Sequence, residues 1–285
     1  MINRFSQVIA LLIFAGGLLF VNAATSMAST AFMLSEGQHR YTTGVTYATA
    51  KDTFNQFRRR VPQGCTSRDI SWHHSYTYGY SYYLNLFANG ALSNFACGAQ
   101  PKVTGVGDIQ VGIRGRLDKF RNGRTWELAT WIPTGYDNQR INRLGFGRFG
   151  IWGGVNWSTQ NTGWEASMPS YWEMGTGIQY WFGSPATQSV SFLKWSWRLD
   201  EKGKNRIVLG SKLRLSFRDG TPQFPAALGG FPRFSNDFDQ LRLYAKYSHR
   251  LSKHWTVSTT IGNTVWGRNI SASWTGDLAV TYRWD

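Results

Sequence analysis

The residue types best suited to covalent chemistry in this 285-residue chain are two cysteines and five histidines. Cys65 and Cys97 form no CxxC motif, so the sequence does not indicate dithiol redox chemistry or a cysteine metal site. No spacing of His, Asp and Glu suits a set of metal ligands. We therefore expect neither a metal nor a cofactor.

Among catalytic arrangements, the sequence comes closest to a serine–histidine pair. His74 is followed directly by Ser75, but adjacent residues of a strand point to opposite faces. A histidine and a serine from different strands could still meet, because a catalytic triad is defined by its geometry. Loop or interface positions explain the histidines more simply, and we expect no enzyme activity. The histidines are His39, His73, His74, His249 and His254.

Charged and polar residues gather on one face of three alternating segments, and this spacing suits electrostatic chemistry on that face. The segments are Asp108 to Leu117, Arg206 to Arg218 and Asp277 to Trp284. In each, the alternate positions carry aliphatic or aromatic side chains. Lys and Arg outnumber Asp and Glu by 31 to 16, so we expect the polar face to carry surplus positive charge.

The same alternation dominates the chain from residue 38 onward and predicts β-strands that are apolar on one side. A helical period is almost absent. We expect twelve strands, an even number as in single-chain bacterial barrels. They cover 38–49, 67–80, 81–92, 105–118, 124–134, 146–157, 171–181, 188–199, 206–218, 238–250, 255–264 and 271–285.

The first residues are typical of a secretory signal. Arg4 supplies the positive start, residues 8–21 are apolar, and Ala23 ends a small-residue cleavage site. The apolar run is shorter than the roughly 20 residues that a spanning helix needs, so a cleaved signal is favoured over an anchor. We expect a signal peptide at 1–23, a periplasmic lead or plug at 24–37, and one domain at 38–285.

Connections between the predicted strands alternate in length, as in outer-membrane barrels with periplasmic turns and outer loops. Short turns are predicted at 119–123, 160–163 and 202–205, and longer loops at 50–66, 93–104, 135–145 and 219–237. Cys65 and Cys97 fall in two of the longer loops. Export to an oxidising compartment favours a disulfide between them, although two free thiols stay possible.

The apolar face of these strands could meet lipid or a second sheet, because a soluble β-sandwich alternates in the same way. The export signal favours lipid. The face also becomes aromatic toward its ends, as at Trp195 and Trp197, and aromatic rings prefer membrane interfaces. A backbone that crosses lipid must satisfy its hydrogen bonds internally, so the strands have to close. We predict an all-β, antiparallel transmembrane barrel in the bacterial outer membrane.

The last strand supports this prediction. Leu278, Val280, Tyr282 and Trp284 share one face and look like the C-terminal signal by which barrel-assembly machinery recognises its clients. Asp285 follows the terminal aromatic residue, which is a departure from that pattern. We expect this machinery to be a partner.

Charged side chains in mid-strand belong inside such a barrel, because Arg or Lys at the bilayer midplane costs roughly 2 to 4 kcal/mol. They could form a packed ion-pair network that conducts nothing, or line a watery path that favours anions. The basic excess could instead lie at the rim, for instance in Arg58-Arg59-Arg60, and contact lipopolysaccharide phosphates. The expected interior residues are Arg114, Lys194, Lys212, Arg214, Arg242 and Lys246, with the acids Asp108, Glu127, Glu173 and Asp277.

Short motifs spread over most of the mature chain resemble the outer-membrane proteins associated with the meta-pathway of phenol degradation, relatives of FadL-type transporters. The resemblance implies a barrel of about twelve strands linked with transport of small, often aromatic or hydrophobic compounds. That family has no agreed binding residues to carry over. The motifs are Leu34-Ser35-Glu36-Gly37, Gly105-Val106-Gly107-Asp108-Ile109 with Gly112, Pro133-Thr134-Gly135, Trp266-Gly267-Arg268-Asn269 and Tyr282-Arg283-Trp284.

We therefore expect a passive outer-membrane channel for small organic solutes, with a preference for anionic or aromatic ones. The alternative is a closed structural or assembly barrel that binds a partner through its loops. Membrane lipid and lipopolysaccharide are expected partners. Nucleic acid is not, because an exported barrel does not meet it in ordinary function.

Overall fold

The computed structural model describes residues 33–98, 102–117, 123–135, 144–161, 170–183, 186–217 and 237–285. The predicted signal peptide at 1–23 and residues 24–32 of the predicted lead lie outside these ranges. Within them, no helix has the length and apolar character needed to cross a membrane.

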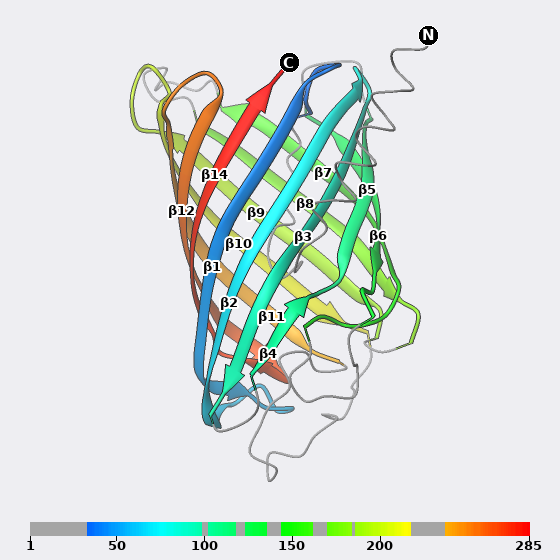
Figure 1. The fold of residues 1–285 in the computed structure, drawn as a ribbon, viewed down its shortest axis with the longest axis vertical. Helices are drawn as coiled ribbons and strands as arrows, with labels where there is room; N and C mark the ends of the chain where they lie inside the picture. The colour runs from blue at the N-terminus through cyan, green and yellow to red at the C-terminus, as the bar shows by residue number, and fades with distance from the viewer. Residues whose placement is uncertain are drawn as a thin grey trace.

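The described ranges contain fourteen β-strands, which pair antiparallel in one sheet (Figure 1). Twelve of them form a barrel. The short β4 pairs with the end of β3, and the short β13 pairs with the end of β1. The strands are β1 (His39–Phe54), β2 (Arg60–Ser81), β3 (Leu84–Cys97), β4 (Val103–Val106), β5 (Ile109–Arg116), β6 (Thr125–Ile132), β7 (Gly150–Asn161), β8 (Ser170–Trp181), β9 (Gln188–Arg198), β10 (Asn205–Ser216), β11 (Asp239–Arg250), β12 (Trp255–Arg268), β13 (Ile270–Ser271) and β14 (Trp274–Trp284).

The sheet closes on itself because β1 pairs with β2 on one side and with β14 on the other. The register between β1 and β14 runs from His39 opposite Trp284 to Thr49 opposite Trp274. Closure leaves the twelve barrel strands with no free edge, as a lipid-embedded backbone requires. The prediction of a closed, twelve-stranded antiparallel barrel is confirmed.

The main departure from the predicted strands lies at one end of β1 and β2. The sequence predicts a loop over 50–66, whereas β1 continues to Phe54 and β2 begins at Arg60. This stretch carries Lys51, Asp52 and a run of arginines, so neither face is apolar and alternation gives no signal. Similarly, the predicted strand 105–118 divides into β4 and β5 around Gly107 and Asp108.

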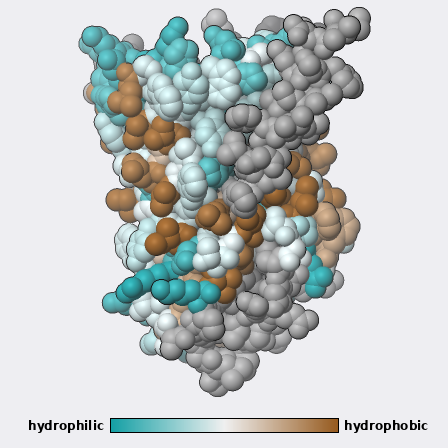
Figure 2. All heavy atoms as spheres, in the orientation of Figure 1, coloured by the Kyte–Doolittle hydropathy of each residue, from teal (hydrophilic) through white to brown (hydrophobic). Residues whose placement is uncertain are grey.

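Aliphatic side chains face outward around the barrel. On the face shown in Figure 2, hydrophobic side chains form a broad zone with hydrophilic ones above and below it. An exposed apolar surface of this extent marks contact with a membrane or a partner, and its continuation around a closed barrel identifies it as the lipid face. Outward aliphatic side chains that are 40% to 61% exposed include Val45, Ile70, Leu128, Ile151, Ile178, Leu193, Leu209, Leu243, Ile261 and Leu278.

Aromatic residues on the same outward face cluster toward the strand ends. Trp255, Tyr282 and Trp284 form a continuous group near the C-terminus, with ring centroids 4.4 and 5.2 Å apart. At the opposite end, Tyr180 and Phe182 are in edge-to-face contact at 5.2 Å. Aromatic rings at both ends of an aliphatic zone are the pattern expected at the two membrane interfaces.

The turn between β9 and β10 shows how the short connections are built. Leu199 N donates to Asn205 O at 2.9 Å, and Gly203 adopts a φ of +60° that favours glycine. The amide of Lys204, helped by that of Asn205, donates to the Asp200 carboxylate and lowers the pKa of Asp200. The predicted turn at 202–205 is therefore present, whereas residues 119–122 and 162–163 of the other two predicted turns lie outside the described ranges.

Residues 33–37 of the predicted lead pack against the barrel end at which β2 turns into β3. Gly37 N donates to Gly79 O, and Gly79 N donates to Gln38 O, both at 2.8 Å. A Cβ atom at Gly79 would lie 1.9 Å from the carbonyl oxygen of Ser35. The lead therefore needs glycine at this position of β2 in order to approach the strand.

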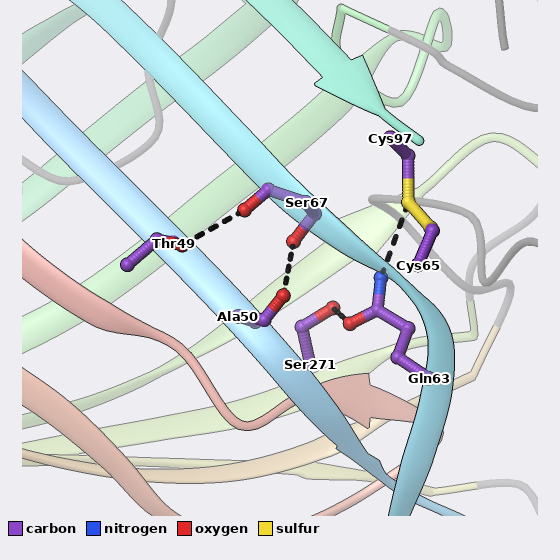
Figure 3. The surroundings of a disulfide bond; sticks show 7 residues. All are labelled: Thr49, Ala50, Gln63, Cys65, Ser67, Cys97 and Ser271. Carbon is purple, nitrogen blue, oxygen red and sulfur yellow. Dashed lines mark hydrogen bonds between the residues drawn. A yellow bond between two sulfur atoms is a disulfide. The ribbon is translucent and has the colours of Figure 1, made fainter. Parts of the chain in front are cut away.

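A disulfide joins Cys65 and Cys97, whose Cα atoms are 5.6 Å apart (Figure 3). The predicted pairing is confirmed, but the cysteines lie in strands β2 and β3 rather than in the predicted loops. Gln63 is buried beside it; its amide nitrogen lies 3.7 Å from Cys97 Sγ and its oxygen accepts from Ser271 Oγ at 3.3 Å. The disulfide therefore links β2 to β3 in the part of the sheet that extends beyond the predicted strands.

Replacing Ile261 by Arg should destabilise the barrel by roughly 2 to 4 kcal/mol, because this side chain is 61% exposed on the lipid face in mid-strand. The free energy of urea unfolding from lipid vesicles measures the effect. Thr260→Arg, one residue away on the inward face, is the matched control. Equal losses for the two variants would contradict the assignment of faces.

Replacing Cys65 and Cys97 together by Ser should lower the free energy of unfolding by about 3 to 4 kcal/mol, since the bond closes a loop with a sequence separation of 32. Urea titrations of the oxidised protein and of the double variant measure the difference. The wild-type protein after reduction should approach the variant. Unchanged stability would show that the bond adds nothing to this part of the sheet.

Candidate functional site

Eight of the ten charged residues predicted to face the interior lie in mid-strand, on the side of their strands opposite the lipid-facing aliphatic residues. This placement follows from strand geometry, because alternate side chains point to opposite faces. Arg114, Glu127 and Glu173 are buried, and the other five are partly exposed. Arg114 is on β5, Glu127 on β6, Glu173 on β8, Lys194 on β9, Lys212 and Arg214 on β10, and Arg242 and Lys246 on β11.

Two ion pairs engage two of the four predicted acids, Glu127 and Glu173. Arg114 lies directly opposite Glu127 in the β5–β6 register, and its Nη2 is 2.6 Å from Glu127 Oε2. Lys194 lies opposite Glu173 in the β8–β9 register, with Nζ 3.5 Å from Oε1. Charges this deeply buried are costly unless they are paired. The two carboxylates therefore neutralise two of the predicted cations.

The other four predicted cations have no ion-pair partner among the described residues. Lys212 lies directly opposite Arg242 in the β10–β11 register and is also within electrostatic range of Arg214. Like charges placed opposite one another destabilise a sheet. Lys246 follows Arg242 on the same face of β11. These four residues, Lys212, Arg214, Arg242 and Lys246, are called the cationic strip below.

Further basic residues continue the positive surface toward the end of the barrel that carries the C-terminus. Arg40 lies opposite Arg283 in the β1–β14 register, and Arg206 lies opposite Arg198 in the β9–β10 register. Sequence reasoning placed Arg206 and Arg283 on a polar face without including them in the lumen, and it missed Arg40. The alternation after His39 is weak because Arg40 is followed by several small or hydroxylated residues.

Asp277 on β14, an expected interior acid, is held by side chains of two other strands. It accepts hydrogen bonds from His73 Nε2 at 2.6 Å and from Thr46 Oγ1 at 2.8 Å. The His73 ring crosses Gly44 of the intervening strand, where a Cβ atom would lie 2.7 Å from Nε2. The glycine is what allows β2 and β14 to be linked across β1.

The described histidines do not assemble a catalytic triad. His74 hydrogen-bonds Tyr41, whereas Ser75 donates to Asn89 Oδ1 at 2.6 Å on the other face. His73 shares the inward face with Ser75 and pairs with Asp277, but the Ser75 hydroxyl is directed to the amide and not to the ring. The described residues also contain no group of three or more His, Cys, Asp or Glu side chains placed to hold a metal.

Acids at the end of the barrel opposite the C-terminus hold the connecting segments. Asp108, predicted as an interior acid, accepts from the amides of Phe146 and Gly147 at 2.7 and 3.3 Å. Asp239 pairs with Arg58 and Arg268, each at 3.1 Å. Both carboxylates are buried. These two acids hold connecting segments and form no ion pair with the cationic strip.

An inward aromatic cluster occupies this same end and was not predicted. Phe146 packs on Trp181 with ring centroids 4.4 Å apart and stacks on Phe238 at 6.1 Å. Sequence reasoning assigned tryptophans to the lipid interfaces by residue type. Strand parity could have placed Trp131, Trp152 and Trp181 inside. The buried members are Phe87, Ala129, Trp131, Trp152, Trp181 and Val190.

Glycines on neighbouring strands let these rings lie along the wall. Trp152 lies over Gly154 and Gly177, where Cβ atoms would come within 2.4 and 2.5 Å of its ring. Trp181 lies over Gly150 in the same way, at 2.6 Å. The rings therefore cover backbone and do not extend straight across the barrel.

The fold resembles those of solved outer-membrane proteins. The match to an outer membrane channel from Pseudomonas putida F1 covers 88% of this chain and 97% of that channel's chain, with 11% identity and a TM-score of 0.69. The match to the translocator domain of the autotransporter NalP from Neisseria meningitidis covers 99% of this chain and 96% of that domain, with 11% identity and a TM-score of 0.49. The match to a FadL homologue from Pseudomonas aeruginosa covers 94% of this chain and 95% of that homologue, with 10% identity and a TM-score of 0.42.

At such low identity, the likeness to the Pseudomonas putida protein shows the fold alone, and the two weaker similarities carry no argument. No protein-family model matches the sequence, and the comparison with curated proteins finds no relative. Together with the closed sheet and its lipid face, the fold makes this protein a β-barrel of the bacterial outer membrane, as predicted. Membership of the phenol-degradation family stays a prediction.

Replacing Arg114 by Ala should cost about 3 to 5 kcal/mol of unfolding free energy, because it leaves the Glu127 carboxylate buried without its partner. The combined change Arg114→Met and Glu127→Leu should cost less, since no charge is stranded. Urea unfolding measures both, with Arg59→Ala as an exposed control. A single variant as stable as the control would contradict a structural role for the pair.

Proposed function

We propose that this protein is a passive channel whose interior favours small organic anions. The observation that carries the proposal is the cationic strip, in which four basic side chains face the interior without a carboxylate partner among the described residues. Fixed positive charge along an enclosed watery path lowers the barrier for anions and raises it for cations.

Partial exposure of the strip supports a hydrated interior over a packed ion-pair network. Lys212, Arg214, Arg242 and Lys246 keep some contact with solvent, whereas Arg114 and Glu127 are buried against each other. Since the lipid lies on the opposite face of these strands, the exposed parts of the strip point into the barrel. A fully packed network would bury all of them.

Charge continuity supports passage along the barrel axis. Arg40 and Arg283 carry the positive surface from the strip toward the end near the C-terminus. Lys246 of the strip is within electrostatic range of Arg40, which links the two regions. An anion that leaves the strip would therefore meet further cations before the barrel ends.

The second candidate is a closed barrel that binds a partner through its loops, and the aromatic cluster favours it. Phe146 and Phe238, which lie in connections between strands, stack on each other and on the inward Trp181. Such packing narrows that end of the barrel. A protein closed there would conduct nothing, so conductance distinguishes the two candidates.

We also propose two contacts outside the lumen. Arg59 and Arg60 are exposed beside the lipid-facing strands, and Arg59 suits the phosphates of lipopolysaccharide, while Arg60 pairs with Asp52 at 2.7 Å. Arg58 instead pairs with Asp239. The outward row Leu278, Val280, Tyr282 and Trp284 is the surface offered to the barrel-assembly machinery.

In planar bilayers with a potassium chloride gradient, the wild-type protein should conduct and favour chloride. Replacing Arg214 and Arg242 by Gln should lower the chloride-to-potassium permeability ratio, because a charge about 6 Å from an ion in water contributes roughly 0.7 kcal/mol, or about three-fold. Lys253→Gln, in an exposed turn, is the charge-matched control. Absence of both conductance and solute uptake into liposomes would overturn the channel.

A further inference from the structure

Arginine recurs at one end of the barrel, on the strand face that is turned toward the interior. On six of the described strands, it is one of the two terminal residues at the end that carries the C-terminus. Each lies an even number of residues from an interior side chain of its own strand, and alternate residues share a face. The six are Arg40 of β1, Arg116 of β5, Arg198 of β9, Arg206 of β10, Arg250 of β11 and Arg283 of β14, and they are called the mouth arginines below.

The charges of several mouth arginines act on one another. Arg283 lies directly opposite Arg40 in the β1–β14 register, and Arg206 lies directly opposite Arg198 in the β9–β10 register. Arg283 is also within electrostatic range of Arg206 and Arg250. Strands β11 and β12 lie between those that carry Arg283 and Arg206, so this positive charge extends over several strands of the barrel mouth.

The carboxylates described at this end do not neutralise the mouth arginines. None of them forms an ion pair with a mouth arginine in the described part of the chain. Asp200 accepts from two amides of its own turn, and Asp285 accepts from a glutamine side chain at 3.0 Å. Glu36 and Glu201 are exposed to solvent. The mouth therefore carries net positive charge.

Uncharged groups hold three of these side chains in place along the wall. Arg206 lies over the ring of Tyr171, with Cζ 5.3 Å from the centroid. Arg40 Nη2 donates to Thr77 Oγ1 at 3.2 Å, and Arg250 Nη2 donates to a carbonyl of the β9–β10 turn at 2.9 Å. A guanidinium has five donors, and these two make one side-chain hydrogen bond each among the described residues. Their positive charge is not compensated by these contacts.

The opposite end of the barrel differs in its chemistry. The aromatic cluster lies there, together with the buried carboxylates of Asp108 and Asp239. The two mouths are therefore unlike in charge. Binding at the mouth arginines should depend on the side from which a solute arrives.

We propose that the mouth arginines bind a small multivalent anion, one that carries negative charge on several phosphate or carboxylate groups. The inference rests on the proposed anion channel and names the solutes that are retained at one of its mouths. Rings of basic side chains select anions and phosphates in pores, and a guanidinium can bind either oxyanion with two parallel hydrogen bonds. A multivalent anion reaches several of the separated arginines at once, whereas acetate offers a single group.

Calorimetric titration of the purified, detergent-solubilised protein tests the site with tripolyphosphate, citrate and acetate as probes. At least one of the two multivalent probes should bind about ten-fold or more tightly than acetate, because the Coulomb energy grows with the charge of the ligand. The tighter of the two identifies the acid group that the site takes. Added sodium chloride should weaken this binding steeply, since salt screens exposed charges.

Replacing Arg206 and Arg283 together by Gln should weaken binding of the tighter probe about ten-fold or more, because it removes two of the charges that lie within range of each other. Arg283→Gln alone should weaken it about three-fold, and this exposed side chain can be changed without disturbing the fold if the double variant does not fold. The matched control is Arg59→Gln with Arg68→Gln, which removes two exposed arginines at the opposite end of the barrel. The control should bind as the wild type does.

Single-channel recordings test the position of the site. Tripolyphosphate should reduce the chloride conductance at a lower concentration from one chamber than from the other, and Arg206→Gln with Arg283→Gln should remove this difference. Equal affinities for acetate and both multivalent probes, or unchanged binding in the Arg206→Gln, Arg283→Gln variant, would overturn the site.

Failure of the site and failure of the channel give different results. Chloride-selective conductance without any preference for a multivalent anion over acetate would remove the site and leave the channel standing. Multivalent-anion binding that depends on Arg206 and Arg283, in a protein that conducts no ions, would keep the site and remove the channel.

Discussion

Backbone hydrogen bonding between the first and last strands is the interaction on which the rest of the structure depends. A strand edge left open in lipid would expose unpaired amide and carbonyl groups, each costing several kcal/mol. The pairing of β1 with both β2 and β14 removes that cost. Once the sheet is closed, each strand has one face toward lipid and one toward an interior. Charged mid-strand residues such as Arg114, Glu127 and Glu173 are then held at defined places inside.

The distribution of acids gives the interior its character more than the net charge of +15 does. Glu127, Glu173 and Asp277 each have a basic side chain or histidine beside them. Asp108 and Asp239 hold backbone amides or arginines at one end. The carboxylates are therefore engaged in architecture, and the cations that outnumber them leave the inner surface positively charged.

Glycine and aromatic residues shape the same interior in a complementary way. Trp152 lies on Gly154 and Gly177, and Tyr244 lies on Gly210. Each large ring thus covers backbone on the neighbouring strand instead of crossing the barrel. Where connecting residues such as Phe146 enter, the rings pack against one another. One end of the barrel is accordingly aromatic, while its middle and other end are cationic.

The amino-acid sequence by itself determined the strands, their two faces and the inward position of residues such as Arg214 and Glu127, because a period of two assigns every side chain to a face. Tertiary structure alone decided which strands are neighbours, and hence that Glu127 neutralises Arg114 while Lys212 meets Arg242. It also decided that β1 and β2 extend past the apolar zone, and that tryptophans turn inward over glycines. Register and closure join residues far apart in the chain, and an alternating pattern contains no information about that pairing.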